Sequence, residues 1–321
     1  MIKNPIAFVS GSTGATGRAV VAQLANSGKW RVLALTRQPN RNKLELFPEI
    51  ETGRLSKVTL MYEKDPEDWS KFDPIQMPRV DEIMAYFLCH GTSREYPDVN
   101  EDMDKDGQEG FKKWLQRIDV DMTRRIARRA VDTRAPIIVR LSASKADPEC
   151  DPTEFGGFGL YFKFQGLADK ALEDLFAAGP SSLPRFGQFV RRKGETRVLI
   201  FRPGSLDRGE ELRKGRPWER DIAKTGARPT MPVGLLASAM IKEVNIHMQD
   251  RHSPQEFYLI GDSSFKIYPY EDVWELINDI NANSAPPPPP PPPAAASSSS
   301  TAPAAASSSS AAPASGYSAR P

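Results

Sequence analysis

The sequence predicts an α/β fold in which helices cover both faces of a doubly wound parallel sheet. Short apolar runs alternate with stretches of helical spacing along most of the chain, which is the pattern of repeated strand–helix units. The runs are apolar at nearly every position, as expected for strands that are buried on both faces. The first run leads directly into a glycine-rich turn and then into a helical pattern.

Six short apolar runs are the predicted parallel strands. They cover residues 6–10, 31–36, 57–62, 82–89, 136–141 and 198–201, and a further strand is predicted at residues 257–260. Apolar residues at three- and four-residue steps predict helices over residues 19–25, 111–132, 160–177, 235–247 and 270–281. Because strands and helices alternate, we expect one α/β domain over residues 1–284, with a small C-terminal lobe.

Composition narrows the class of protein. The 321 residues include 43 Lys and Arg against 41 Asp and Glu, a formal net charge of +2 that argues against nucleic-acid binding. No apolar run approaches the ~18 residues of a membrane span. Two lone cysteines, Cys89 and Cys150, suit a reducing compartment, and we expect a cytoplasmic protein. The chain has no CxxC motif and no pair of histidines four residues apart, so no metal site is expected.

Residues 285–321 have a separate, low-complexity composition. Eight consecutive prolines at 286–293 favour an extended polyproline II segment, and the sequence AAASSSS then occurs twice. Such small residues cannot bury enough apolar surface to fold, so a disordered Pro/Ala/Ser-rich tail is predicted. Alternatively, the proline run is a ligand for a proline-reading protein module.

The turn after the first strand predicts a dinucleotide site. Its glycines follow the pattern GxxGxxG: the first permits a tight turn, the second close approach of a pyrophosphate, and the third close packing of helix on strand. The helix that follows offers its N-terminal N–H groups to anionic oxygens. A Rossmann-type fold is therefore expected, although a purely structural turn is the alternative. The predicted cofactor-binding residues here are Gly11, Ser12, Thr13, Gly14, Ala15, Thr16 and Gly17.

Arg37 predicts which dinucleotide is bound. It stands at the end of the second strand, where an acidic residue would select NAD and a basic residue suits the 2′-phosphate of NADP. Arg18 lies beside the glycine loop and Arg41 near Arg37, and no acid appears before Glu45. NADP(H) is therefore predicted, and the alternative is that Arg37 is an ordinary surface arginine.

Five segments in a fixed order carry a family resemblance. They are GSTGATGR at 11–18, FLCHGTSRE at 87–95, RLSASKAD at 140–147, LYFKFQG at 160–166 and FRPGSL at 201–206. Together they resemble atypical short-chain dehydrogenase/reductases, closest to Tat-interacting-protein-like oxidoreductases and more distantly NmrA-like proteins, over residues 6–248. The resemblance implies an NADPH-binding Rossmann domain with a substrate-side C-terminal lobe, and a reductase of a carbonyl or quinone-like substrate. It adds Gly91 and Pro203 to the cofactor-binding residues.

The resemblance also implies the catalytic residues. In such proteins a Tyr-x-x-x-Lys pair shares one helix face, where the ammonium favours tyrosinate and binds the nicotinamide ribose. Tyr161 matches the tyrosine, but the lysine position is Gln165. A serine after the fifth strand holds the substrate oxygen; Ser142 and Ser144 both qualify, and Ser144 is preferred.

The missing lysine leaves two functions open. One is an enzyme with a compensated mechanism, in which Gln165→Lys is expected to raise the rate. The other is a non-catalytic NADP(H)-bound scaffold or redox sensor that recruits partners through its insertions and tail. His90, just after the fourth strand, either borders the nicotinamide or substrate pocket or holds a loop.

Overall fold

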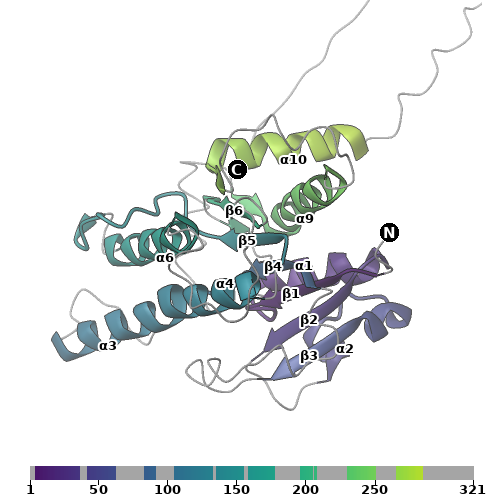
Figure 1. The fold of residues 1–321 in the computed structure, drawn as a ribbon, viewed down its shortest axis with the longest axis horizontal. Helices are drawn as coiled ribbons and strands as arrows, with labels where there is room; N and C mark the ends of the chain where they lie inside the picture. The colour runs from purple at the N-terminus through teal and green to yellow at the C-terminus, as the bar shows by residue number, and fades with distance from the viewer. Residues whose placement is uncertain are drawn as a thin grey trace, which may run out of the picture. The chain divides into compact units, whose positions relative to one another are not determined.

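A seven-stranded parallel sheet is the centre of the computed structural model (Figure 1). The structure describes residues 4–36, 42–62, 83–91, 105–132, 135–154, 158–177, 196–204, 206–207, 230–250 and 265–284. The strand order is β3-β2-β1-β4-β5-β6-β9, and every neighbouring pair is parallel. The strands are β1 (Ile6–Ser10), β2 (Arg31–Thr36), β3 (Val58–Tyr62), β4 (Ile83–Leu88), β5 (Ile137–Leu141), β6 (Arg197–Phe201) and β9 (Phe265–Tyr268). The predicted α/β class with a parallel sheet is confirmed.

The strand order reverses beside β1. The chain runs outward from β1 through β2 to β3, then returns to place β4 on the other side of β1. Such a reversal opens a crevice at the carboxyl ends of the strands, where ligands bind in doubly wound sheets. The chain segments that follow β1, β4, β5 and β6 all lie at this carboxyl edge.

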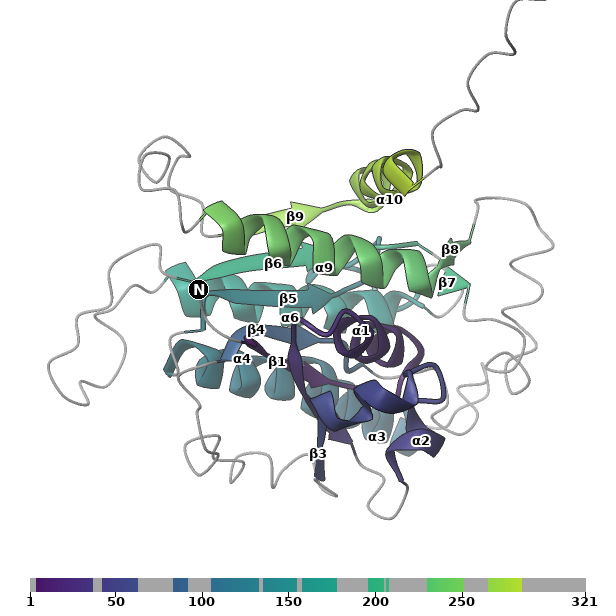
Figure 2. The same cartoon turned by 90° about the vertical axis from the view of Figure 1, so that its right-hand side faces the viewer.

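Helices pack on both faces of the sheet, which explains the unbroken apolar runs (Figure 2). Ala7 and Val9 of β1 pack with α1 (Ala15–Asn26), α9 (Val233–Asp250) and α10 (Tyr270–Ser284). Phe8 and its neighbours on the other face pack with α4 (Met122–Asp132) and α6 (Gly159–Ala177). Alternate residues therefore face opposite layers, and both sets must be apolar.

The helix predicted at 111–132 contains a wider turn. It begins with α3 (Lys105–Leu115), passes through the π-helical turn η5 (Gln116–Asp121) and continues as α4. Such single π turns occur mostly inside α-helices. Three consecutive side chains in this turn are buried, including that of Asp119, which comes close to Gly91.

The remaining elements are two short helical segments, a second small sheet and the last strand of the main sheet. A helix α2 (Lys43–Leu46) and a 3₁₀ turn η1 (Thr52–Lys57) connect β2 to β3. A two-stranded parallel sheet, β7 (Leu206–Asp207) with β8 (Met231–Pro232), precedes α9. The seventh strand of the main sheet is β9, whereas the strand predicted at 257–260 lies outside the described residues.

None of the helices in the described ranges is long and apolar enough to cross a membrane. The last described element, α10, ends at Ser284, where the domain boundary was predicted. Residues 285–321 lie outside the described residues, so both the boundary and the nature of the tail stay predictions.

Candidate cofactor and active site

Two glycines of the loop after β1 are required by the packing of the chain itself. Gly11 has φ +63°, and a Cβ there would lie 2.5 Å from the backbone nitrogen of His90, so the turn passes directly over the end of β4. A Cβ on Gly17 would lie 2.2 Å from the carbonyl oxygen of Gly11, so α1 starts in contact with the loop. Gly14 is different: it is exposed, and its Cβ would approach only the Gly11 carbonyl oxygen, at 3.3 Å. The middle glycine thus leaves the outer side of the loop open.

The N-terminus of α1 fits an anionic group. Gly14 is its N-cap residue and supplies no side-chain cap, and no acidic residue stands in the first turn. The first N–H groups of the helix have no intrahelical acceptor, and the helix dipole makes this end positive. Buried Ser12 donates to the Leu35 carbonyl oxygen at 2.6 Å and ties the loop to β2. A fixed, bare and positive helix start of this kind is what a pyrophosphate needs.

The residues predicted to choose between NAD and NADP are only partly described. β2 ends at Thr36, and Arg37 and Arg41 lie outside the described residues. Arg18, in the first turn of α1, forms an ion pair with Glu49. The prediction that Arg37 selects NADP(H) therefore stays a prediction.

His90 is an internal link between β1 and α4. It is buried, with Nδ1 2.6 Å from Ser10 Oγ and Nε2 3.1 Å from Thr123 Oγ1. Thr123 Oγ1 accepts from Arg140 at 3.0 Å, so its own proton is available to Nε2, and Nδ1 is the protonated nitrogen. Burial, and secondarily the charge of Arg140, holds the pKa of His90 well below its usual value. His90 is therefore neutral near pH 7 and holds the loop together.

The neighbours of His90 differ from it in exposure. Burial raises the pKa of the Cys89 thiol to about 12, so the thiol stays protonated at neutral pH and is a poor nucleophile. Gly91 is exposed, and a Cβ there would lie 3.4 Å from Asp119 Oδ1. The chain leaves the sheet at this point, with Gly91 at the open edge where a cofactor residue was predicted.

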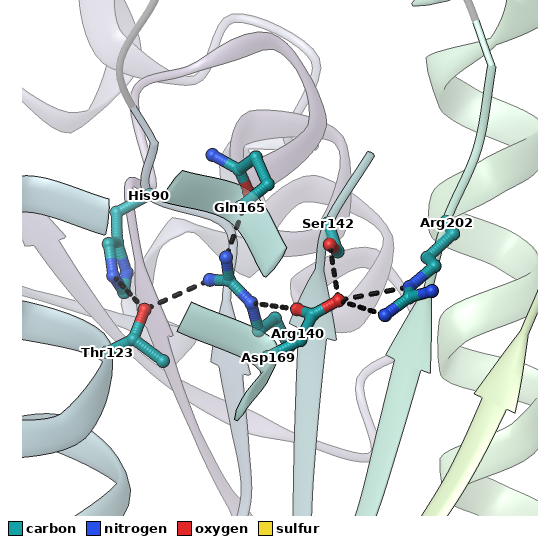
Figure 3. Close-up of polar contacts among 7 residues, drawn as sticks. All are labelled: His90, Thr123, Arg140, Ser142, Gln165, Asp169 and Arg202. Carbon is teal, nitrogen blue, oxygen red and sulfur yellow. Dashed lines mark hydrogen bonds and ion pairs between the residues drawn. The ribbon is translucent and has the colours of Figure 1, made fainter. Parts of the chain in front are cut away.

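A buried ionic network lies between β5 and α6 (Figure 3). Arg140 of β5 is fully buried and uses all three of its nitrogens: Nε donates to Asp169 at 2.8 Å, and Nη2 donates to Gln165 Oε1 at 2.8 Å. Its Nη1 donates to Thr123, as described above. The side chain of Asp169 is only 2% exposed. The pair is thus a buried ion pair in which each guanidinium nitrogen has a hydrogen-bond partner, the form in which a buried charge is tolerated.

Asp169 also connects the ends of β5 and β6. Its Oδ2 accepts from Ser142 Oγ at 2.8 Å and from Arg202 Nε at 3.0 Å, while Arg202 Nη2 lies 2.8 Å away. Arg202 directly precedes Pro203, the predicted cofactor residue after β6. One carboxylate of α6 therefore fixes two chain segments at the carboxyl edge of the sheet.

Helix α6 places Tyr161 and Gln165 one turn apart. Tyr161 is half-buried, packs against the apolar cluster of α3 and α6, and has its ring centroid 5.6 Å from that of Phe162. The helix is held close by Gly166, where a Cβ would lie 2.2 Å from the carbonyl carbon of Asp147. The Asp147 N–H also donates to the Phe162 carbonyl oxygen. The loop after β5 is thus pressed against α6.

The two candidate serines have different surroundings. Ser142 is buried and its hydroxyl is engaged by Asp169. Ser144 is half-buried; its backbone N–H donates to the Pro203 carbonyl oxygen at 3.1 Å, and no partner for its hydroxyl is found in the described part of the chain. Ser144 is therefore the serine whose hydroxyl is available at the edge.

The structure places part of the predicted residues at one edge of the sheet and adds others that the sequence reading missed. The loop 11–17, Gly91, Ser144 and Pro203 all follow the carboxyl ends of strands. Thr123, Arg140 and Asp169 were not predicted as site residues. A signal existed: an arginine inside an apolar strand, and an aspartate four residues after Gln165 on an otherwise apolar helix face.

Comparisons with known proteins support the fold. No protein-family model matches the chain, and no curated protein matches it. Among solved structures, ElxO with NADP bound shares 12% identity, with 82% of this chain and 96% of that chain covered and a TM-score of 0.57. A short-chain dehydrogenase from Burkholderia cenocepacia J2315 in complex with NADP shares 14% identity over 88% and 97% of the two chains, with a TM-score of 0.51. A carbonyl reductase from Pseudomonas aeruginosa PAO1 shares 12% identity over 84% and 97%, with a TM-score of 0.53. These likenesses show that the chain shares its α/β fold with these proteins.

Proposed function

We propose that the protein binds NADP(H) and is an atypical short-chain dehydrogenase/reductase that reduces a carbonyl or quinone-like substrate. The observation that carries the proposal is the bare N-terminus of α1 above a glycine loop, at the point where the strand order reverses. Residues 11–17 would hold the pyrophosphate, with Gly91 and Pro203 further along the same edge. The bound cofactor would supply a hydride to the substrate carbon.

The remaining chemistry falls to residues of the chain. Ser144 would donate a hydrogen bond to the substrate oxygen, since its hydroxyl is available in the described structure. Tyr161 would then give its phenolic proton to that oxygen, so that hydride and proton together make the alcohol. Gln165, one turn later on α6, would hydrogen-bond the ribose of the cofactor.

Arg37 is expected to make the protein prefer NADPH over NADH. An arginine at the end of β2 pairs with the 2′-phosphate, and two of the solved structures of this fold are named as NADP complexes. Calorimetric titration of the wild type should show ~10-fold or greater preference for NADPH, lost in Arg37→Ala. Arg124→Ala, which removes an exposed arginine of α4, is the matched control and should keep the preference. Equal affinity of the wild type for both cofactors would contradict the assignment.

Tyr161→Phe is the test of catalysis. Wild-type NADPH oxidation is measured across a panel of quinones and aldehydes, and the variant is expected to lose ~100-fold or more of the rate, since it lacks the proton donor. Its NADPH affinity should stay within about twofold. Tyr62→Phe, which changes an exposed tyrosine of β3, should be indistinguishable from wild type. Turnover that survives Tyr161→Phe would remove this residue from the mechanism.

A second candidate function is a non-catalytic NADP(H)-bound scaffold or redox sensor. The observation in its favour is Gln165, which carries no charge to favour tyrosinate. This function predicts tight NADPH binding with no turnover in any variant. The panel above therefore separates the two functions.

A further inference from the structure

The orientation of the Gln165 carboxamide is fixed by its partner. Gln165 is 3% exposed, and its Oε1 accepts from Arg140 Nη2. An arginine has only donors, so the carboxamide must turn its oxygen toward the guanidinium and its two N–H donors away. Figure 3 shows the amide nitrogen of Gln165 on the side away from Arg140. Without this contact, either end of the amide could face the site.

The same network contains more positive than negative charge. Arg140 is fully buried, and the Asp169 carboxylate that neutralises it is shared with Arg202. Two guanidinium cations against one carboxylate leave one positive charge in the cluster of Arg140, Asp169 and Arg202; Arg140 is fully buried, and the Arg202 side chain is 23% exposed. In a poorly solvated interior, such a charge acts over longer distances than it would in water.

We propose that Arg140 is a positioning residue: it orients the amide donors of Gln165 and supplies the positive charge that the side chain at position 165 lacks. The inference rests on the proposed function, because its ligand is the nicotinamide end of the cofactor. In it Arg140 does not touch the cofactor. It turns the Gln165 N–H groups toward the nicotinamide end of the cofactor site, and its own positive charge lies against the Gln165 oxygen.

This inference changes the expectation for Gln165→Lys. The structure places position 165 in direct contact with the Arg140 guanidinium, so a lysine there would bring two cations together in a buried place. The single substitution is therefore expected to lower the thermal midpoint and to give no gain in rate. Arg140→Leu combined with Gln165→Lys moves the charge from one residue to the other and should be tolerated better than Gln165→Lys alone.

The effect of the Arg140 charge can be measured from the relative affinities of the oxidised and reduced cofactor. The nicotinamide ring is cationic in NADP⁺ and neutral in NADPH, so a positive charge nearby favours the reduced form. The ratio of the two dissociation constants thus reports charge, whereas general structural damage weakens both forms alike. In the wild type NADPH should bind more tightly than NADP⁺.

The test is a series of variants in which the two dissociation constants are measured by titration and the thermal midpoint is recorded. Arg140→Leu and Gln165→Glu each lower the cluster charge by one and should shift the ratio ~5- to 10-fold toward NADP⁺. Arg140→Leu with Gln165→Lys should restore the wild-type ratio. Gln165→Met keeps the charge but loses the donors, so it should weaken the binding of both cofactor forms about equally.

Thr196→Val is the control for general destabilisation. It removes a buried hydrogen bond at the amino end of β6 and should lower only the thermal midpoint.

The outcomes decide between the interpretations. A ratio that follows the cluster charge across the series supports the inference. An unchanged ratio in Gln165→Glu and Arg140→Leu, with binding intact, overturns it and leaves the proposed function standing. If Arg140→Leu fails to fold, Gln165→Glu and Gln165→Lys change the charge in opposite directions with Arg140 in place, and their ratios decide. A wild type that binds neither cofactor form overturns the proposed function and this inference with it.

Discussion

Asp169→Ala is expected to be the most destabilising single substitution proposed here. It removes a carboxylate that accepts from Arg140, Ser142 and Arg202, and it leaves the buried Arg140 guanidinium without its counter-ion. Breaking a buried ion pair in this way costs about 3–5 kcal/mol of unfolding free energy. For a folded part of this size, the thermal midpoint should fall by roughly 10 °C. Differential scanning calorimetry measures the change.

The matched control is Asp174→Ala, on the same helix. The side chain of Asp174 is 64% exposed, and within the described ranges it pairs with Lys170 alone, at 3.5 Å. Exposed pairs of this kind contribute about 0.3–0.5 kcal/mol, so the midpoint should move by no more than about 2 °C. Equal shifts for the two variants would show that the network between β5 and α6 contributes no more than a surface pair.

Gly17→Ala is expected to abolish tight cofactor binding. The new Cβ would stand 2.2 Å from the Gly11 carbonyl oxygen and 3.1 Å from the Ser12 Cα, so the start of α1 must move away from the loop. An Å-scale displacement of the groups that hold a ligand costs on the order of 100-fold, and we expect NADPH affinity to fall by this factor. Titration of the purified variant measures it.

Gly234→Ala is the control for this substitution. Gly234 is also near the start of a helix, α9, but among the described residues no atom outside its own chain neighbours and helix backbone lies within 4 Å of its added Cβ. Its NADPH affinity should match that of the wild type. Full affinity in Gly17→Ala would mean that the loop after β1 is not the cofactor cradle.

The strands of the sheet were predictable because burial on both faces leaves a plain signal. The six main strands begin and end within one residue of their predicted bounds. The edge strand β9 was not predicted. Its sequence, Phe-Lys-Ile-Tyr, is only four residues long and contains a lysine, so it lacks the continuous apolar run by which the other strands were recognised. The π-helical turn was also missed, because apolar steps of three and four residues tolerate one extra residue without a visible break.

The candidate site was predictable only where its residues are contiguous. The glycine loop has a fixed spacing, so one short segment of sequence was enough to predict its turn and its contact with the helix that follows. The network of Arg140 joins residues 17 to 29 positions apart along the chain, and only the fold brings β5 against α4 and α6. Gln165 therefore looked like a simple loss of charge in the sequence, whereas the structure shows the guanidinium beside it.

The contact between Arg140 and Gln165 also constrains how this sequence can evolve. A lineage that acquired a lysine at position 165 first would pass through a form with two buried cations in contact. One that lost Arg140 first would leave Gln165 Oε1 without its donor and Asp169 with only one of its two arginine partners. Each single step is disfavoured while the double change is tolerated, so the two positions are epistatic. Descendants of this chain should therefore show Arg140 and Gln165 retained or replaced together.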